Sequence, residues 1–301
     1  MPLAPTTPEA IARAFEAACL AELRAVKPGN VFVGSEGHGM TVQDFARSAA
    51  AAAPALVAPA AGVGVRLLAA VRATRDVVGQ NTNLGILLLA TPLVEAALGG
   101  GAGDSLEVAT AAVLRATTIA DADAVYAAIR LARPGGLGRS ATQDVAAVPS
   151  CTLLEAMTLA ADRDRIAWNH VHDLADLFGP GRYRLRMLAA RSWPPVWIVT
   201  GIYLGFLGMI PDTHVARKHG TPMAGEVQRR AASLDAELLA AAEPQELEAS
   251  LLAFDRELKH SGINPGTSAD LTVATLLAET LTSGCNPAID EAPINRVEAS
   301  P

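Results

Sequence analysis

The sequence contains few aromatic residues. Phe, Trp and Tyr together make up 4% of the 301 residues, although half of the residues are hydrophobic and alanine supplies much of that half. A β-sandwich or β-barrel would need many more aromatic and β-branched residues. Alanine has the highest helix propensity and loses no side-chain entropy in a helix. The composition therefore predicts a helical protein.

Cysteine is also scarce. Cys19, Cys151 and Cys285 lie far apart and do not have the spacing of metal ligands. An odd and sparse cysteine count is typical of proteins in a reducing compartment. The first residues show neither a basic segment nor the apolar segment of a secretion signal. We therefore expect a cytoplasmic protein.

The sequence has no excess of positive charge. Its formal net charge of −7 argues against nucleic acid as a partner, because nucleic-acid binding usually needs an extended basic face. This balance still permits a local basic pocket for a small phosphorylated ligand. The oligomeric state is left open, and a homodimer is one outcome.

One uncharged stretch, residues 194–210, raises the question of a membrane span. It has 17 residues, which is the short limit for a spanning helix, and it contains Thr200, Tyr203 and three glycines. Apolar segments of this length are more often core helices. We expect a buried helix here and no membrane. The alternative is a non-catalytic helical scaffold or membrane-associated protein built around this segment.

Helix signals cover nearly the whole chain. A helix should start at Thr7-Pro8, because Thr is a favoured cap and Pro is favoured in the first turn. Capping boxes are expected at 41–44 and 104–107. No alternating strand pattern and no repeat are visible. We expect a single-domain all-α multi-helix bundle over residues 1–285 and a disordered tail over 286–301. One helix is predicted from residue 8 toward residue 26, and two others begin at residues 42 and 104. The remaining predicted helices cover 63–78, 84–98, 123–132, 152–161, 163–178, 183–209 with a break at 194–195, 224–241, 245–260 and 268–282.

Four polar turns at predicted helix ends carry most of the candidate chemistry. The most informative turn contains Asn264-Pro265-Gly266-Thr267-Ser268-Ala269-Asp270 and precedes an apolar helix over 271–281. The free amides of such a helix start suit a phosphate, and Asp270 could bind a metal or take a proton. The other turns are 27–30, 81–85 and 212–214, and the Gly-rich loop 134–150 is the longest predicted non-helical stretch. We predict that the turns meet in one catalytic pocket.

Taken in order, these motifs resemble the triphosphoribosyl-dephospho-CoA synthase family. The resemblance covers roughly residues 10–283. The Arg130–Gly138 and Gln143–Val145 segments, together with Gly-Asn-Val at 29–31, are similar to a side branch associated with one-carbon and tetrahydromethanopterin genes. The motifs that carry the family resemblance are Lys27-Pro28-Gly29, Gly37-His38 with Asp44, Asn81-Thr82-Asn83-Leu84-Gly85, Asp212-Thr213-His214-Val215-Ala216-Arg217-Lys218, and Pro265-Gly266-Thr267-Ser268-Ala269-Asp270-Leu271.

The resemblance implies an ATP-dependent transferase whose partners are small nucleotides. Its reaction moves the triphosphoribosyl group of ATP to a ribose hydroxyl of 3′-dephospho-CoA and releases adenine. Such chemistry passes through an oxocarbenium-like state and needs a base, a donor to the leaving group and phosphate clamps. Asp270 and Asp212 are the candidates for Mg²⁺ binding or for the general base, because Mg²⁺ favours one or two carboxylates together with phosphate oxygens.

The remaining candidates are assigned by residue type, and each has a structural alternative such as a helix cap or a solvated surface. His38 lies in a Gly-rich loop and has a suitable pKa for acid–base catalysis. The candidates for substrate binding are Lys27, Asn30, Asn81, Thr82, Asn83, Arg139, Arg217, Lys218 and Ser268.

The chain departs from the citrate-type members of this family at one motif. Asn83 and Leu84 stand where those members usually have His and Lys. A ring and a cation that could contact phosphate are therefore both missing. This difference favours an alternative in which the same fold acts on another acceptor, in tetrahydromethanopterin or one-carbon cofactor biosynthesis.

Overall fold

The computed structural model describes residues 7–59, 62–100 and 104–289. This part of the chain contains no strand and only two isolated bridges, so the predicted all-α class is confirmed. The elements in order are α1 (Pro8–Arg24), α2 (Val42–Val57), α3 (Val63–Val78), α4 (Leu84–Gly99), α5 (Leu106–Arg115), α6 (Ile119–Ala132), α7 (Leu153–Thr158), α8 (Arg165–Val171), the π turn η1 (Leu177–Gly181), α9 (Arg182–Ala189), α10 (Pro195–Met209), α11 (Thr213–His219), α12 (Thr221–Ala240), the 3₁₀ turn η2 (Pro244–Leu247), α13 (Glu248–His260) and α14 (Gly266–Ser283).

Several helix boundaries follow from local signals in the sequence. Thr7 caps α1 through its side chain, and Thr41 and Asp44 form the predicted capping box at the start of α2. Helix α3 ends at Gly79, whose left-handed backbone (φ 76°) suits glycine. These boundaries agree with the predictions.

Three predicted boundaries are wrong. Ser105 alone caps α5, so the expected capping box at 104–107 is absent. Helix α6 begins at Ile119, earlier than predicted, because Thr118 forms a capping box with Asp121. The helix predicted over 163–178 stops at Val171, since the backbone turns left-handed at Asp173 and Leu174.

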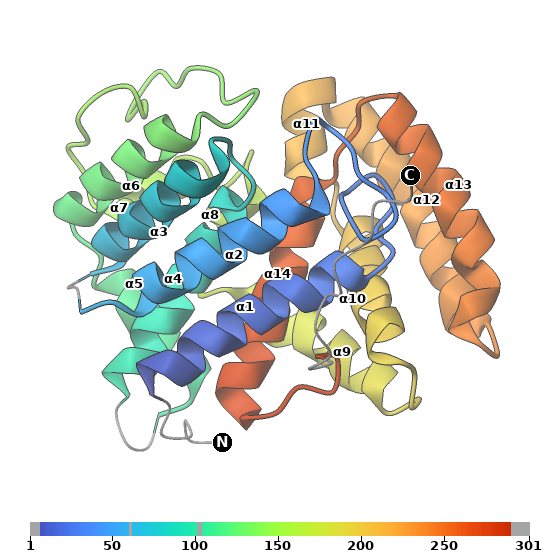
Figure 1. Cartoon of the computed structure of the whole chain (residues 1–301). Helices are drawn as coiled ribbons and strands as arrows, with labels where there is room; N and C mark the ends of the chain where they lie inside the picture. The colour runs from blue at the N-terminus through green and yellow to red at the C-terminus, as the bar shows by residue number, and fades with distance from the viewer. Residues whose placement is uncertain (1–6, 60–61, 101–103, 290–301) are drawn as a thin grey trace.

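Helices α4, α10 and α14 form the interior of the molecule. Most of their residues are buried, and α14 packs against α1, α4 and α10. Figure 1 shows α14 running through the middle, with α3 and α6 to one side and α12 and α13 to the other. Within the described ranges no single helix is long and apolar enough to cross a membrane, and α10 passes that test only together with α11, across a 53° bend.

The start of the expected disordered tail packs on the bundle. Asn286 and Ala288 are buried, and the Asn286 side-chain amide donates to the Leu276 carbonyl over 2.8 Å. The rest of that segment, residues 290–301, lies outside the described residues. Of the four described residues of the expected tail, 286–289, only Pro287 is exposed, so this part of the tail belongs with the bundle.

Candidate active site

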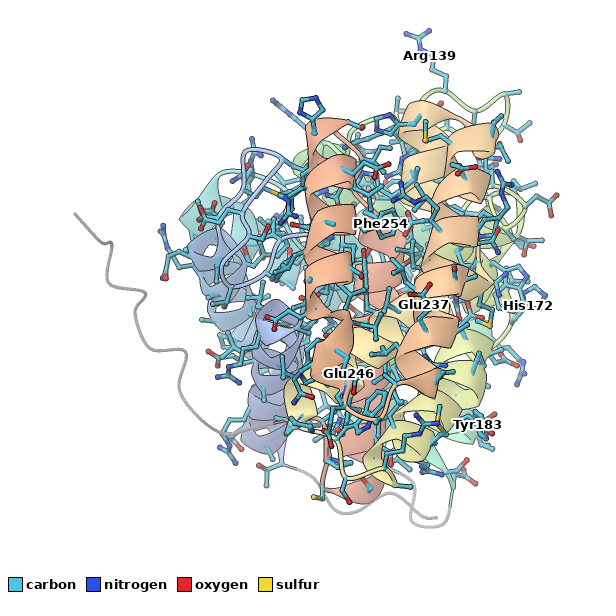
Figure 2. All side chains as sticks on the ribbon, turned by 90° about the vertical axis from the view of Figure 1, so that its right-hand side faces the viewer. Arg139, His172, Tyr183, Glu237, Glu246 and Phe254 are labelled. Carbon is cyan, nitrogen blue, oxygen red and sulfur yellow. The ribbon has the colours of Figure 1, made fainter. Side chains whose placement is uncertain are left out.

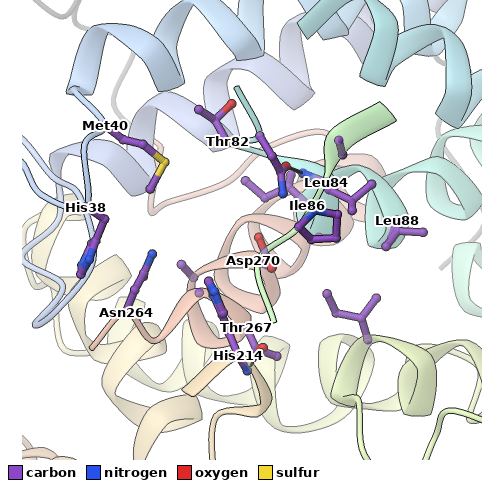
Figure 3. A pocket seen from close by; sticks show the side chains of 18 of the residues that line it. His38, Met40, Thr82, Leu84, Ile86, Leu88, His214, Asn264, Thr267 and Asp270 are labelled. Carbon is purple, nitrogen blue, oxygen red and sulfur yellow. Dashed lines mark hydrogen bonds between the residues drawn. The ribbon is translucent and has the colours of Figure 1, made fainter. Parts of the chain in front are cut away.

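A cavity of about 420 Å³ lies where the polar turns meet. Its wall includes the first turns of α4 and α14, the loop after α1, the loop after α6 and the start of α11. Figure 3 shows Asp270 facing the middle of this cavity, with Thr82 and Ile86 on one side and His38 and His214 on others. The structure thus brings together seven of the predicted site residues, namely Asn30, His38, Asn81, Thr82, Arg217, Lys218 and Asp270.

Asp270 is the acid in this cavity that has no partner among the described residues. No hydrogen bond or ion pair to its carboxylate occurs among the described residues, whereas Glu22 pairs with Lys27 and Asp164 pairs with Arg217. Burial raises the pKa of Asp270 well above its usual value, and the nearby Asp212 and Glu22 charges raise it further. A carboxylate with a raised pKa is suited to accept a proton near neutral pH.

Gly85 makes room for this carboxylate. A Cβ atom built on Gly85 would overlap the carboxylate of Asp270 and would also press on Ile166. The glycine of the Asn-Thr-x-x-Gly motif therefore lets the first turn of α4 approach Asp270 closely. Gly266 has a similar relation to the ring of His214.

We expect Gly85→Ala to lower kcat by about 100-fold, because a displacement of about 1 Å at a reacting group can cost that much. Alanine is favoured over glycine in a helix by roughly 0.5–1 kcal/mol, so thermal unfolding should change little. Gly99→Ala is the matched control, since Gly99 ends the same helix and no neighbour lies within 4 Å of its added Cβ. Steady-state kinetics and a thermal melt of both variants test this. Equal activity in the two variants would show that Asp270 tolerates displacement.

Asp212 has a different setting from Asp270. It is buried and caps α11, where one oxygen accepts from the amides of His214 and Val215. The other oxygen accepts from the amide of Ser268 at 2.8 Å and from its hydroxyl at 2.9 Å. Both oxygens are therefore used to join α11 to α14, and neither Asp212 nor Ser268 lines the cavity.

The hydrogen bonds from Ser268 to Asp212 also change the expectation for the start of α14. We expected free amides there for a phosphate, but the Ser268 amide binds Asp212 and the Gly266 amide binds the Asn264 carbonyl. A carboxylate of the protein already occupies the place of the anion at this helix start. A phosphate must be held mainly by other groups.

The residues of the central motif divide between the cavity and the interior. Asn81 and Thr82 line the cavity, and the Asn81 side-chain oxygen accepts from the amide of Leu84, the first residue of α4, at 3.1 Å. Asn83 is buried and donates to the Thr74 hydroxyl instead. The structure does not bring Asn83 to the cavity surface.

Lys27 is buried with its ammonium group turned inward. It pairs with Glu22 and donates to the Asn30 side-chain oxygen at 3.1 Å. Burial lowers the pKa of Lys27 and raises that of Glu22. Asn30 in turn donates to Asn264 at 2.8 Å, and both asparagines line the cavity. Lys27 itself does not line it.

His38 faces the cavity from a strained loop position. Its backbone is left-handed (φ 57°), and its Nε2 lies 2.8 Å from the Gly29 carbonyl oxygen. Because a carbonyl only accepts, Nε2 must carry the hydrogen. Burial lowers the pKa of His38, which favours the neutral ring. The Nδ1 atom of that ring is then an acceptor.

His214 lines the cavity and was not among the predicted site residues. Burial lowers its pKa to about 3, and the charges of Lys218 and Arg217 add to this effect. Its ring is therefore neutral near pH 7. The Asp-Thr-His motif contained the signal, because a histidine directly after an acidic helix cap must lie in the first turn of that helix.

The basic residues of the cavity come from three elements. Arg217 and Lys218 were predicted, and the Arg217 guanidinium donates to Asp164 at 3.4 Å and to the Gly135 carbonyl at 3.2 Å. Arg75 and Arg133 also line the cavity, and sequence reasoning missed both. Within the described part of the chain, Lys218, Arg75 and Arg133 have no acidic partner. These four cations add positive charge to the lining of the cavity.

Arg139 lies elsewhere. It is exposed on the loop after α6, and Figure 2 shows it projecting from the molecular surface. It does not line the cavity around Asp270. The structure therefore does not bring it into the cavity that holds Asp270, Arg217 and Lys218.

The chain was compared with known proteins. The model of the CitG family, described as ATP:dephospho-CoA triphosphoribosyl transferase, matches residues 8–287. A crystal structure from Archaeoglobus fulgidus, titled as a putative triphosphoribosyl-dephospho-CoA synthase, is similar with 27% identity and a TM-score of 0.60. The similarity covers 78% of this chain and 98% of that chain. No curated protein matches the chain significantly.

Proposed function

Because the chain belongs to the CitG family of ATP:dephospho-CoA triphosphoribosyl transferases, we propose that the cavity around Asp270 is its active site. There the triphosphoribosyl group of ATP moves to a ribose hydroxyl of dephospho-CoA, and adenine leaves. The observation that carries this proposal is the Asp270 carboxylate, which has a raised pKa and no partner in the described part of the chain, in a cavity that also holds four cationic side chains.

The reaction exchanges one bond at the anomeric carbon of the ATP ribose. The carbon–nitrogen bond to adenine breaks, and its electron pair leaves with adenine. The acceptor hydroxyl oxygen forms the new bond and gives up its proton. One proton therefore passes from the hydroxyl to adenine overall, while positive charge builds on the ribose in between.

Asp270 is the proposed base for the acceptor hydroxyl. It can take the proton because no group in the described part of the chain competes for its oxygens, and its negative charge also favours the positive ribose in the transition state. The two roles require the same position, directly beside the anomeric carbon. The close approach permitted by Gly85 supports that position.

The cationic residues are the proposed clamp for the triphosphate. Arg217 offers a planar fork that suits phosphate oxygens, and Lys218 offers a flexible point charge. Arg75 and Arg133 line the same cavity without acidic partners in the described ranges. Because salt screens the attraction between these positive charges and the negative triphosphate, ATP binding should weaken as salt concentration rises.

The polar uncharged residues are proposed to orient the nucleotide. Asn81, Thr82 and Asn30 offer hydrogen-bonding groups for ribose hydroxyls or for the edge of the base, and His38 offers an acceptor at Nδ1. Asp212 and Ser268 are proposed as positioning residues, because their mutual hydrogen bonds fix the start of α14 and therefore Asp270.

Mg²⁺ enters the proposal with ATP and not as a resident ion. Among the described residues no group of three His, Cys, Asp or Glu side chains could hold a metal. Both oxygens of Asp212 are already occupied by hydrogen bonds, so this residue does not fit as a ligand. The donor set fits an ion held chiefly by phosphate oxygens and water, and no step of the reaction is assigned to it.

Adenine release tests the proposed function. The purified protein incubated with ATP, Mg²⁺ and dephospho-CoA should release adenine and form one new acceptor product of matching mass, which chromatography with mass spectrometry detects. Omission of dephospho-CoA is the control and should suppress adenine formation. If adenine appears at the same rate without the acceptor, the protein hydrolyses the nucleotide and the transfer assignment is wrong.

A second candidate keeps the site and changes the acceptor. Asn83 is buried outside the cavity lining, and Leu84 lines the cavity with an apolar side chain. Neither residue therefore supplies the ring or the cation that citrate-type members have at this motif. A different hydroxyl-bearing acceptor from one-carbon pterin cofactor synthesis would fit this difference. The same adenine assay with a pterin-cofactor precursor in place of dephospho-CoA separates the two candidates.

A further inference from the structure

A second cavity of about 620 Å³ adjoins the first. It lies among α6, α7, α8, the start of α11 and the loop after α6. The two cavities share part of their lining, so they are neighbours across a common wall. The shared residues are Leu88, Ile129, Leu137, Asp164, Ile166 and Arg217.

The lining of the second cavity is mixed. Outside the shared wall it includes the apolar side chains of Val125, Leu153 and Met157, together with Ala156 and Ala160. Charged side chains also line it, namely Arg139, Asp144, Asp162, Arg163 and Arg165. Polar groups enter from the loop after α6, which packs back on α6. This cavity can therefore hold a ligand that has apolar methylene and methyl groups and also carries several polar groups such as amides.

Hydrogen bonds hold the loop that covers this cavity. The Tyr126 hydroxyl donates to the Gln143 carbonyl at 2.7 Å, and the Arg130 guanidinium donates to the Val145 carbonyl at 2.5 Å. Asp144 accepts from the amides of Ser140 at 2.6 Å and Ala146 at 2.9 Å. The loop is thus an ordered wall of the cavity, which suits a binding site for a defined ligand.

We propose that the second cavity binds the pantetheine arm of the acceptor, an inference that rests on the proposed function. Both substrates must place their reacting ends beside Asp270, so their remaining parts need separate room. The arm of dephospho-CoA is a flexible chain with two amides and a terminal thiol, joined to adenosine through a diphosphate. Arg217 lines both cavities, so its charge can face the diphosphate of this acceptor as well as the triphosphate of ATP.

Ala160→Trp tests the assignment by filling the second cavity. Ala160 lines this cavity and not the first, and it is only partly buried. With dephospho-CoA as acceptor, kcat/KM should fall by about tenfold or more, because the arm loses buried apolar contacts. With ADP, which ends where the arm begins, kcat/KM should stay at its wild-type value. The KM for ATP should also be unchanged.

Two further variants make the result interpretable. Ala249→Trp makes the same change on the exposed surface of α13, on the other side of the molecule in Figure 1, and should leave both acceptors unaffected. Ala156→Leu is a smaller obstruction in the second cavity and should reproduce the selective loss if Ala160→Trp does not fold. Equal losses for dephospho-CoA and ADP, or no loss for either, would overturn the assignment.

Direct binding separates this inference from the proposed function. Calorimetry with dephospho-CoA should show weaker binding to Ala160→Trp than to the wild-type protein. If that loss occurs but the wild-type protein releases no adenine, the arm site stands and the reaction is wrong. If adenine is released and Ala160→Trp binds dephospho-CoA normally, the reaction stands and the arm site is wrong.

Discussion

Replacement of Asp270 by asparagine should lower kcat by about 10²–10⁴-fold, the usual contribution of a general base. Asparagine keeps the size of the side chain but cannot take the proton of the acceptor hydroxyl. It also removes the negative charge that faces the ribose in the transition state. Adenine release under saturating ATP and dephospho-CoA measures the effect. Asp123→Asn, at an exposed position on α6, is the matched control and should retain full activity.

The same variant should not lose stability. The raised pKa means that the native protein binds a proton at Asp270 more tightly than the unfolded chain does. Ionisation of Asp270 therefore destabilises the folded state. The wild-type protein loses this stability as pH rises from the usual aspartate range through the raised pKa. Asparagine carries no such charge, so the variant should melt at or above the wild-type temperature at neutral pH. A large drop in melting temperature would show that Asp270 is structural.

The pH dependence of kcat/KM gives an independent readout, because this ratio reports the ionisation of the free enzyme. A base must be ionised to act, so kcat/KM should fall on the acid side, with an apparent pKa above that of an ordinary aspartate. The residual activity of Asp270→Asn should lack this acid limb. An unchanged acid limb in the variant would assign it to another group.

The parts of the fold that could be predicted depend on local signals. Thr41 with Asp44, and Gly79 after an apolar segment, set helix ends through contacts between residues close in sequence. The end of α8 depends on left-handed backbone at Asp173 and Leu174, neither of which is glycine. That conformation depends on the surrounding structure, so the sequence pattern continued the helix too far.

In the candidate site, too, the sequence predicted local features but not contacts between distant residues. It placed acidic residues at two helix starts but could not show that Asp212 is hydrogen-bonded within the protein whereas Asp270 faces the cavity. The difference depends on hydrogen bonds from Ser268, 56 residues later, which occupy the Asp212 carboxylate. The Asp270 carboxylate has no such partner within the described ranges. Similarly, Lys27 has the residue type of a phosphate ligand, but Glu22 on the preceding helix holds its ammonium group inside the protein.

That buried pair leads to the largest expected effect on stability. Lys27→Met should destabilise the protein by about 3–5 kcal/mol, because removal of one partner leaves an uncompensated buried charge. Glu22 and Lys27 are only 4% and 1% exposed, so water cannot replace the lost partner. Urea unfolding at pH 7 measures the loss. The double variant Glu22→Gln/Lys27→Met should recover most of it, since it removes both charges together.

The pH dependence of Lys27→Met follows from the remaining carboxylate. Burial already raises the pKa of Glu22 in the wild-type protein, and the lysine charge opposes that shift. Loss of the lysine should raise the pKa of Glu22 further, so the variant loses stability as pH rises through that value and regains it when Glu22 is protonated.

Lys218→Met is the control, because Lys218 is exposed at the cavity. It should unfold like the wild-type protein while its KM for ATP rises. If Lys27→Met shows this second pattern, with normal unfolding and a raised KM for ATP, then the Lys27 ammonium contacts the triphosphate during the reaction.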